Sequence, residues 1–153
     1  MPKLKQGLIV AALVIALDQI SKYIIMQMFL WGDLLKVTAF FDLVRAHNTG
    51  AAFSLFADQP GWQQGFFIAV ASIASAVIIY LLRRDTGSNL SKLALSLILG
   101  GAIGNLIDRL SHGYVIDFLS FHINSYYWPA FNIADSAITV GAVFLIWDSF
   151  KKP

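Results

Sequence analysis

Four apolar stretches, each about as long as a bilayer is thick, constrain this chain more than any other feature of its sequence. They run from about Gly7 to Phe29, Gln64 to Leu82, Leu93 to Leu110 and Asn132 to Phe150. A hydrocarbon core of about 30 Å needs roughly 20 apolar residues in a helix. The composition points the same way, because 58% of the 153 residues are hydrophobic and only 13% are charged, against about 25% charged in a soluble domain. The sequence predicts an all-α membrane protein, one domain (1–153) with four transmembrane helices.

The lysines and arginines predict how these helices are oriented. The connections after the first and third stretches hold only Lys36 and Arg45. The cytoplasmic side of a membrane protein carries the excess of positive charge, so we expect both termini in the cytoplasm and the two longer connections outside. The basic residues that fall on the expected cytoplasmic side are Lys3, Lys5, Arg83, Arg84, Lys92, Lys151 and Lys152.

The first outer connection predicts two small elements. Residues 37–44 partly alternate apolar and polar side chains, which indicates a short strand. The segment 51–62 (AAFSLFADQPGW) is expected to lie on the bilayer surface as an amphipathic piece. Asp42 and Arg45 are expected as solvated loop charges, and Asp148 as part of an exposed cluster with the C-terminal lysines.

Several chemistries are disfavoured by composition. The chain has no cysteine, so thiolate metal sites and a cysteine nucleophile are excluded. Its three histidines lack the spacing of a metal motif, and we expect neither a metal nor a cofactor. A net charge of +2 is too small to predict nucleic-acid binding.

Five charged residues of the apolar stretches share one depth. At 1.5 Å per residue, Asp18, Lys22, Asp108, Arg109 and Asp135 lie about 17 to 23 Å from the cytoplasmic ends of their helices. Simple pairing joins Asp18 to Lys22, four residues apart on one face, and Asp108 to Arg109. Such pairs fix helix packing, and Gly100, Gly101 and Gly104 allow helices or a ligand to approach closely.

This pairing leaves Asp117 and Asp135 without a cation nearby in the sequence. Two carboxyls that approach closely cannot both ionise, which is the arrangement of an aspartic protease. A structural alternative stays open for each: Asp135 can complete a helix cap begun by Asn132, and Asp117 can be an ordinary loop aspartate. A small transporter or proton relay, and a purely structural bundle, are the competing classes of function.

Five short blocks in this order resemble the lipoprotein signal peptidase (signal peptidase II) family over nearly the whole chain. They are DQISK at 18–22, NTGAAFS at 48–54, GGAIGNLIDR at 100–109, VIDF at 115–118 and FNIADSAI at 131–138. The resemblance implies an intramembrane aspartic endopeptidase with Asp117 and Asp135 as its catalytic pair. It also implies supporting roles, to which the ion-pair reasoning adds Lys22; the residues are Asp18, Lys22, Asn48, Gly50, Asn105, Asp108, Arg109 and Asn132.

The same resemblance implies the substrate and the location. The enzyme would act in the bacterial cytoplasmic (inner) membrane, surrounded by lipid, with its site near the outer, periplasmic face. We expect a monomer, because one bundle contains every group that the mechanism uses. It would remove the signal peptide of a diacylglyceryl-modified prolipoprotein just before the lipidated cysteine. We expect the signal peptide to pack near the glycine-rich face of the third helix, Asn48 and Asn105 to hold substrate, and Arg109 to hold Asp108 in place.

Overall fold

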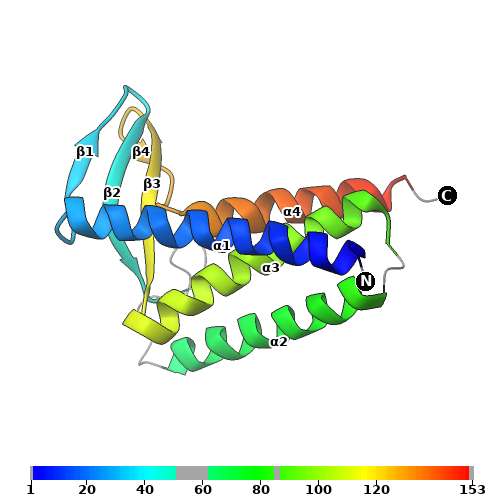
Figure 1. Ribbon diagram of the computed structural model, residues 1–153. Coiled ribbons are helices and arrows are strands. Elements are labelled where there is room, and N and C mark those ends of the chain that lie inside the picture. The colour runs from blue at the N-terminus through cyan, green and yellow to red at the C-terminus, as the bar shows by residue number, and fades with distance from the viewer. Residues whose placement is uncertain (1, 51–61, 85–86, 152–153) are drawn as a thin grey trace.

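A bundle of four helices with a small sheet at one end forms the protein in this computed structural model, which describes residues 2–50, 62–84 and 87–151. The helices are α1 (Pro2–Met28), α2 (Trp62–Arg84), α3 (Asn89–His112) and α4 (Ile133–Ser149). Helix α3 contacts the other three. Figure 1 shows that the start of α1, the end of α2, the start of α3 and the end of α4 share the end of the bundle away from the sheet.

Three of the described helical segments are long and apolar enough to cross a bilayer: Leu4–Met28, Trp62–Arg84 and Asn89–His112. The outer surface of α2 fits such an environment, because Phe66, Ile73 and Val77 are all exposed along it, and contiguous apolar patches are rare on soluble monomers. Helix α4 is shorter, with 17 residues. The fourth span and the orientation of the termini therefore stay predictions.

Glycines allow α3 to pack closely against α1 and α4, as the sequence predicted. A Cβ atom on Gly100 would lie 2.6 Å from the Cβ of Val14 in α1, and one on Gly101 would meet the carbonyl oxygen of Ala134 in α4. This face of α3 is therefore filled by the protein's own helices. A signal peptide therefore cannot pack directly on these two glycines, and its place near this face of the bundle stays a prediction.

Adding one methyl group to α3 is expected to destabilise the protein, whereas the same change in α2 is not. In Gly101→Ala the new methyl overlaps the α4 backbone, and overpacking costs about 1–3 kcal/mol. Around Gly65 a Cβ would meet nothing within 4 Å, so Gly65→Ala is expected to gain about 0.5–1 kcal/mol of helix propensity. Thermal unfolding in detergent measures the stability of both variants. Equal melting temperatures for Gly101→Ala and Gly65→Ala would contradict this packing.

The sheet corrects the expectation of an all-α protein. It consists of β1 (Leu34–Lys36), β2 (Phe41–Asn48), β3 (Val115–Ile123) and β4 (Tyr126–Tyr127), which pair antiparallel in that order. The strand predicted at 37–44 exists but is shifted to β2, and β3 was not predicted. The proposed amphipathic segment lies outside the described residues, apart from Trp62 at the start of α2.

Three charged residues that were expected in solvent make contacts inside the protein instead. Asp42 is fully buried in the sheet, with one carboxylate oxygen 3.3 Å from Nε2 of His122. Arg45 donates to the carbonyl of Phe29 at 2.8 Å, beyond the last turn of α1, where a helix dipole favours a cation. Asp148 is buried at the other end of the bundle and accepts the hydroxyls of Ser88 and Ser91 near the start of α3. The expectation that these three are solvated is wrong.

Candidate active site

Helix α4 begins with a capping box that fixes Asp135. The side chain of Asn132 accepts the backbone N–H of Asp135 at 2.9 Å, and the Asp135 carboxylate accepts the backbone N–H of Asn132 at 3.3 Å. An Asn at the N-cap and an acid three residues later satisfy two donors that a helix start leaves free. The expectation that Asp135 completes a helix cap is therefore confirmed. The cap uses only Oδ2 of Asp135, so a chemical role for Oδ1 is compatible with it.

Asp117 lies on β3, where the pairing with β2 brings Asn48 beside it. After an irregularity between Leu43 and Ala46, the register places Ala46 opposite Asp117 and Asn48 opposite Val115. Residues two apart on a strand share a face, so Asn48 lies diagonally across from Asp117 and donates to its Oδ2 at 3.0 Å. Asp117 is therefore a buried strand residue, not a loop aspartate.

One amide side chain, that of Asn132, connects the two aspartates. Its Nδ2 donates to Oδ1 of Asp117 at 2.7 Å, and it also lies 3.2 Å from Oδ1 of Asn105 and from the carbonyl of Ile116. Because the same residue caps Asp135, the fully buried Asn132 joins α4 to β3.

Asn105 holds the free oxygen of Asp135 from α3. Its Nδ2 donates to Asp135 Oδ1 at 2.8 Å, and its Oδ1 accepts the ammonium of Lys22 at 3.1 Å. The lysine thus fixes the direction of the Asn105 amide, whose donor faces the aspartate.

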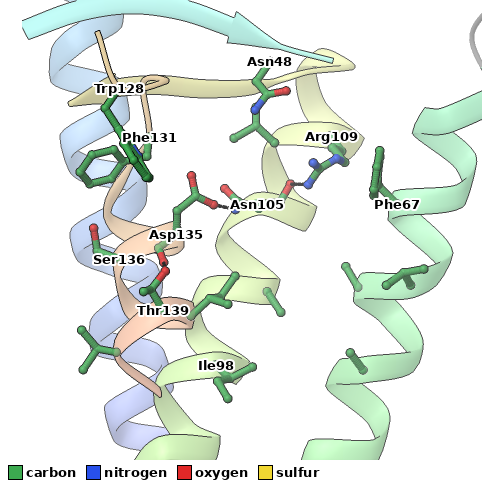
Figure 2. Close-up of a pocket in the computed structure, with 17 residues that line it drawn as sticks. Asn48, Phe67, Ile98, Asn105, Arg109, Trp128, Phe131, Asp135, Ser136 and Thr139 are labelled. Atoms are coloured by element: carbon green, nitrogen blue, oxygen red, sulfur yellow. Dashed lines mark hydrogen bonds between the residues drawn. The ribbon is translucent and has the colours of Figure 1, made fainter. Parts of the chain in front are cut away.

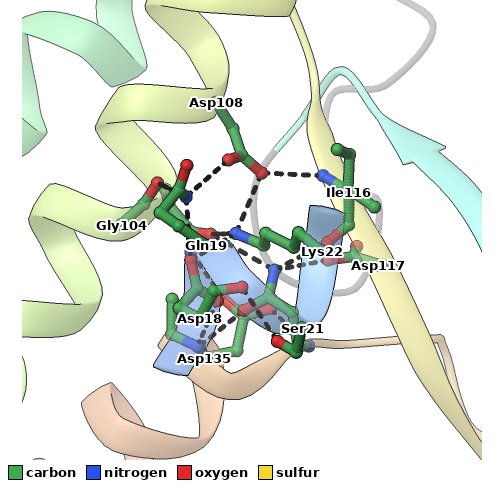
Figure 3. A network of polar contacts seen from close by, with 12 residues as sticks. Asp18, Gln19, Ser21, Lys22, Gly104, Asp108, Ile116, Asp117 and Asp135 are labelled. Carbon is green, nitrogen blue, oxygen red and sulfur yellow. Dashed lines mark hydrogen bonds and ion pairs between the residues drawn. The ribbon is translucent and has the colours of Figure 1, made fainter. Parts of the chain in front are cut away.

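Lys22 also forms ion pairs with two carboxylates, which Figure 3 shows around its ammonium group. The Nζ atom lies 2.8 Å from Oδ2 of Asp18 and 2.9 Å from Oδ2 of Asp108. The predicted Asp18–Lys22 pair is confirmed. The predicted pairing of Asp108 with Arg109 is wrong, because consecutive helical residues point in different directions and Lys22 occupies the place of the partner.

Arg109 instead connects α3 to the end of β2. Its Nη2 donates to the carbonyl of Gly50 at 2.8 Å, and the backbone N–H of Gly50 donates to the side chain of Asn48 at 2.9 Å. The guanidinium also lies over the ring of Phe67 in α2, 5.1 Å from its centroid. Arg109 therefore holds the segment that carries Asn48. The expectation that it holds Asp108 in place is wrong.

A cavity of about 610 Å³ opens beside these groups, between α2, α3 and α4. Figure 2 shows Asp135, Asn105, Arg109 and Asn48 together in it. Its remaining lining is mostly apolar, and Ile98 lies two turns, about 10 Å, before Asn105 along α3. The cavity therefore has one polar region within an apolar wall. Further residues lining it are Phe67, Val70, Ala71, Ala74, Ala102, Val115, Trp128, Phe131, Ser136, Ile138, Thr139 and Val140.

Every residue that the sequence predicted for the site lies in one connected set of contacts. Sequence reasoning missed Gln19, whose Nε2 lies 2.9 Å from Asp108 Oδ1 and 3.2 Å from Asp18 Oδ2. Its position next to Asp18 gave no signal, because adjacent residues on a helix diverge.

The environment of Asp117 favours a proton on the carboxyl group. Burial, and after it the neighbouring Asp135 carboxylate, raise the pKa of Asp117 from 3.8 to about 7, although the amides of Asn48 and Asn132 and the charge of Lys22 oppose the rise. Two coupled carboxyls titrate as a pair. Near neutral pH the arrangement can hold one proton and one negative charge side by side.

The raised pKa of Asp117 predicts how stability depends on pH. In the native state this carboxyl keeps its proton at pH values where the unfolded chain has lost it, so its contribution to stability is present below about pH 3.8 and is lost as the pH rises through about 7. Asp117→Asn cannot titrate. The variant's melting temperature relative to wild type is expected to rise across this interval, and a difference that is constant with pH would contradict the shift.

Comparison with known proteins places this arrangement in a family. The family model for signal peptidase (SPase) II matches residues 10–151. The lipoprotein signal peptidase of Cupriavidus necator is 52% identical over 142 residues, 93% of this chain and 81% of that protein. That of Paraburkholderia phytofirmans is 51% identical over 143 residues, 94% and 83% of the two chains. A bacterial membrane enzyme solved by the in meso method at 2.3 Å is similar with a TM-score of 0.85 at 33% identity, covering 96% of this chain and 88% of its own. The chain therefore belongs to the signal peptidase II family.

Proposed function

We propose that this protein is an aspartic endopeptidase that removes the signal peptide from diacylglyceryl-modified prolipoproteins. Membership of the signal peptidase II family makes it a protease of lipoprotein processing. The observation that carries the aspartic mechanism is the position of Asp117 and Asp135, joined through Asn132 beside the cavity. Cleavage occurs on the N-terminal side of the lipidated cysteine.

The proposed reaction uses one water molecule and the single proton of the pair. The ionised carboxyl takes a proton from water as its oxygen attacks the scissile carbonyl carbon, and the protonated carboxyl donates to the carbonyl oxygen. The tetrahedral intermediate collapses when a proton passes to the amide nitrogen and the carbon–nitrogen bond breaks. The products are the signal peptide's carboxylic acid and a new amino terminus on the cysteine.

The shape of the cavity supports a lipid-bearing substrate. An apolar helix and acyl chains suit its walls of valine, alanine and isoleucine, while the peptide bond needs the polar region where Asn48 and Asn105 can bind backbone or ester groups. We propose that the signal peptide lies here, between α2 and α4, on the side of α3 away from its glycines.

We propose that the protein is a monomer, since one bundle holds every group the mechanism uses. As a signal peptidase II with membrane-spanning helices, it is a bacterial inner membrane protein. We place the sheet and the site at the outer, periplasmic face, with all four helices spanning. The basic residues Arg83, Arg84, Lys92 and Lys151 belong to the opposite end of the bundle, as the positive-inside rule requires.

The dependence of cleavage on lipid tests this proposal. Purified protein in detergent would be given a prolipoprotein peptide with the diacylglyceryl group on its cysteine, and the same peptide with a free thiol. We expect efficient cleavage of the first peptide and at least about a hundredfold lower kcat/KM for the second. The binding energy of the lipid helps to orient the scissile bond, and the second peptide lacks it. Equal cleavage of both peptides would refute the substrate class.

A further inference from the structure

The two proposed catalytic aspartates are each preceded by a residue whose backbone N–H is held by a buried carboxylate. The N–H of Ala134, just before Asp135, donates to Asp18 Oδ1 at 2.9 Å. The N–H of Ile116, just before Asp117, donates to Asp108 Oδ2 at 3.0 Å.

These two carboxylates are themselves bridged to each other by α1. Lys22 forms ion pairs with both, at 2.8 Å to Asp18 and 2.9 Å to Asp108. Gln19, one turn earlier on the same face of α1, makes a second bridge by donating to both. Figure 3 shows these contacts converging from α1 and α3 toward Asp117 and Asp135.

We propose that Gln19 and Lys22 are positioning residues that set the separation of Asp117 and Asp135. The inference rests on the proposed function and extends it to residues that contact neither aspartate. The chain of contacts has two arms: Asp18 fixes the start of α4 at Ala134, and Asp108 fixes β3 at Ile116. Helix α1 joins both arms and thereby defines the spacing between two elements that are distant in sequence.

The burial of this bridge makes it rigid. Lys22 and Asp108 are each 1% exposed and Asp18 is 0% exposed, so water does not compete for their contacts. Each of the three donors of the ammonium has an acceptor: Asp18, Asp108 and Asn105. Because Asn105 in turn binds Asp135, the lysine also orients that carboxylate.

Spacing matters for this chemistry because the two carboxyls must share one proton. Their mutual repulsion weakens as they separate, and the two apparent pKa values of the pair then approach each other. The charged groups around the pair are Asp18 and Lys22 of α1 together with Asp108 and Arg109 of α3. A change at Gln19 alters none of these charges.

Gln19→Met tests the bridge, because methionine keeps the length of the side chain and removes its donors. Lys22 still pairs with both carboxylates, so the variant is expected to fold. We expect kcat on the lipidated peptide to fall about tenfold or more, since small misplacements of catalytic groups are costly. KM should stay near the wild-type value, and the spacing between the acid and alkaline limbs of the pH profile of kcat should differ from that of wild type.

Ser21→Ala is the matched control on the same helix. The Ser21 hydroxyl donates to the backbone carbonyl of Asp18 at 2.8 Å and is not among the contacts made to the two bridged carboxylates. Its loss should leave both kcat and the pH limbs unchanged. If Gln19→Met does not fold, Gln19→Asn replaces it, because its amide is one methylene too short to reach both acceptors and the same losses are expected.

A folded Gln19 variant with wild-type kcat and wild-type limb spacing would overturn this inference. A lower total activity that comes only from fewer active molecules, each with wild-type kcat, would overturn it as well. Asp117→Asn and Asp135→Asn are measured in parallel. If these two variants are active, the proposed function fails whatever Gln19 does. If they are inactive while the Gln19 variant behaves as wild type, only the positioning role fails.

Discussion

Replacing either Asp117 or Asp135 with asparagine is expected to abolish cleavage while leaving the protein folded. Each change keeps the shape of the side chain but removes a titratable proton, and general acid–base catalysis by one group contributes about 10²–10⁴-fold. Because both carboxyls act on one water molecule, we expect each single variant to lose at least about a thousandfold in kcat. The double variant should lose little more, since residues that act as a unit are not additive.

The control for these variants is Asp33→Asn. Asp33 is exposed near the sheet and accepts the backbone N–H of Leu30 at 2.7 Å, so its replacement tests for a general effect of removing an aspartate. Its turnover should equal that of wild type. If Asp135→Asn folds and retains turnover, Asp135 is a helix cap alone. Retained turnover in Asp117→Asn would likewise reduce that residue to a buried strand residue.

Replacing Lys22 with methionine is expected to cost about 3–5 kcal/mol of stability, the range for breaking a buried ion pair from one side. The change leaves the carboxylates of Asp18 and Asp108 buried without their cation. The loss should be partly recovered in Lys22→Met combined with Asp18→Asn, because one of the two uncompensated charges is then removed. Unfolding in detergent, followed by circular dichroism, measures the change.

Lys36→Met provides the comparison, since Lys36 is exposed on β1 and surface changes of this kind stay within about 0.5 kcal/mol. Equal stability of the Lys22 and Lys36 variants would show that the buried cluster contributes nothing to folding. Failure of the double variant to recover stability would mean that the loss arises from packing and not from charge.

The helical part of this fold follows from hydrophobic length, which is why the sequence predicts all four helices to within a few residues. Comparing depths along the helices also predicts one level for Asp18, Lys22, Asp108 and Asp135. In the structure Lys22 pairs with Asp18 and Asp108, and Asn105 connects it to Asp135. The depth of a residue follows from the number of residues along its own helix, without knowing which helix packs beside it. Rotation about the helix axis is different, because it is set by packing between helices.

That distinction explains the errors in pairing. Arg109 follows Asp108 directly, but its side chain is directed to Gly50, and Asp108 is directed to Lys22 of another helix. Strand β3 escaped prediction because residues 115–118 are buried in succession, so the alternation of a half-buried strand is missing. The burial of Asp42 and Asp148 is not predictable from local sequence, because their partners His122 and Ser88 lie far away along the chain.

The most direct test of the account is the mass of the products formed from one diacylglyceryl-modified prolipoprotein by wild type, Asp117→Asn and Asp135→Asn. Wild type is expected to form two products: the intact signal peptide, and a fragment that begins with the lipidated cysteine. Neither variant should form them. Cleavage at another bond, or the same two products from a folded variant at the wild-type rate, would contradict it.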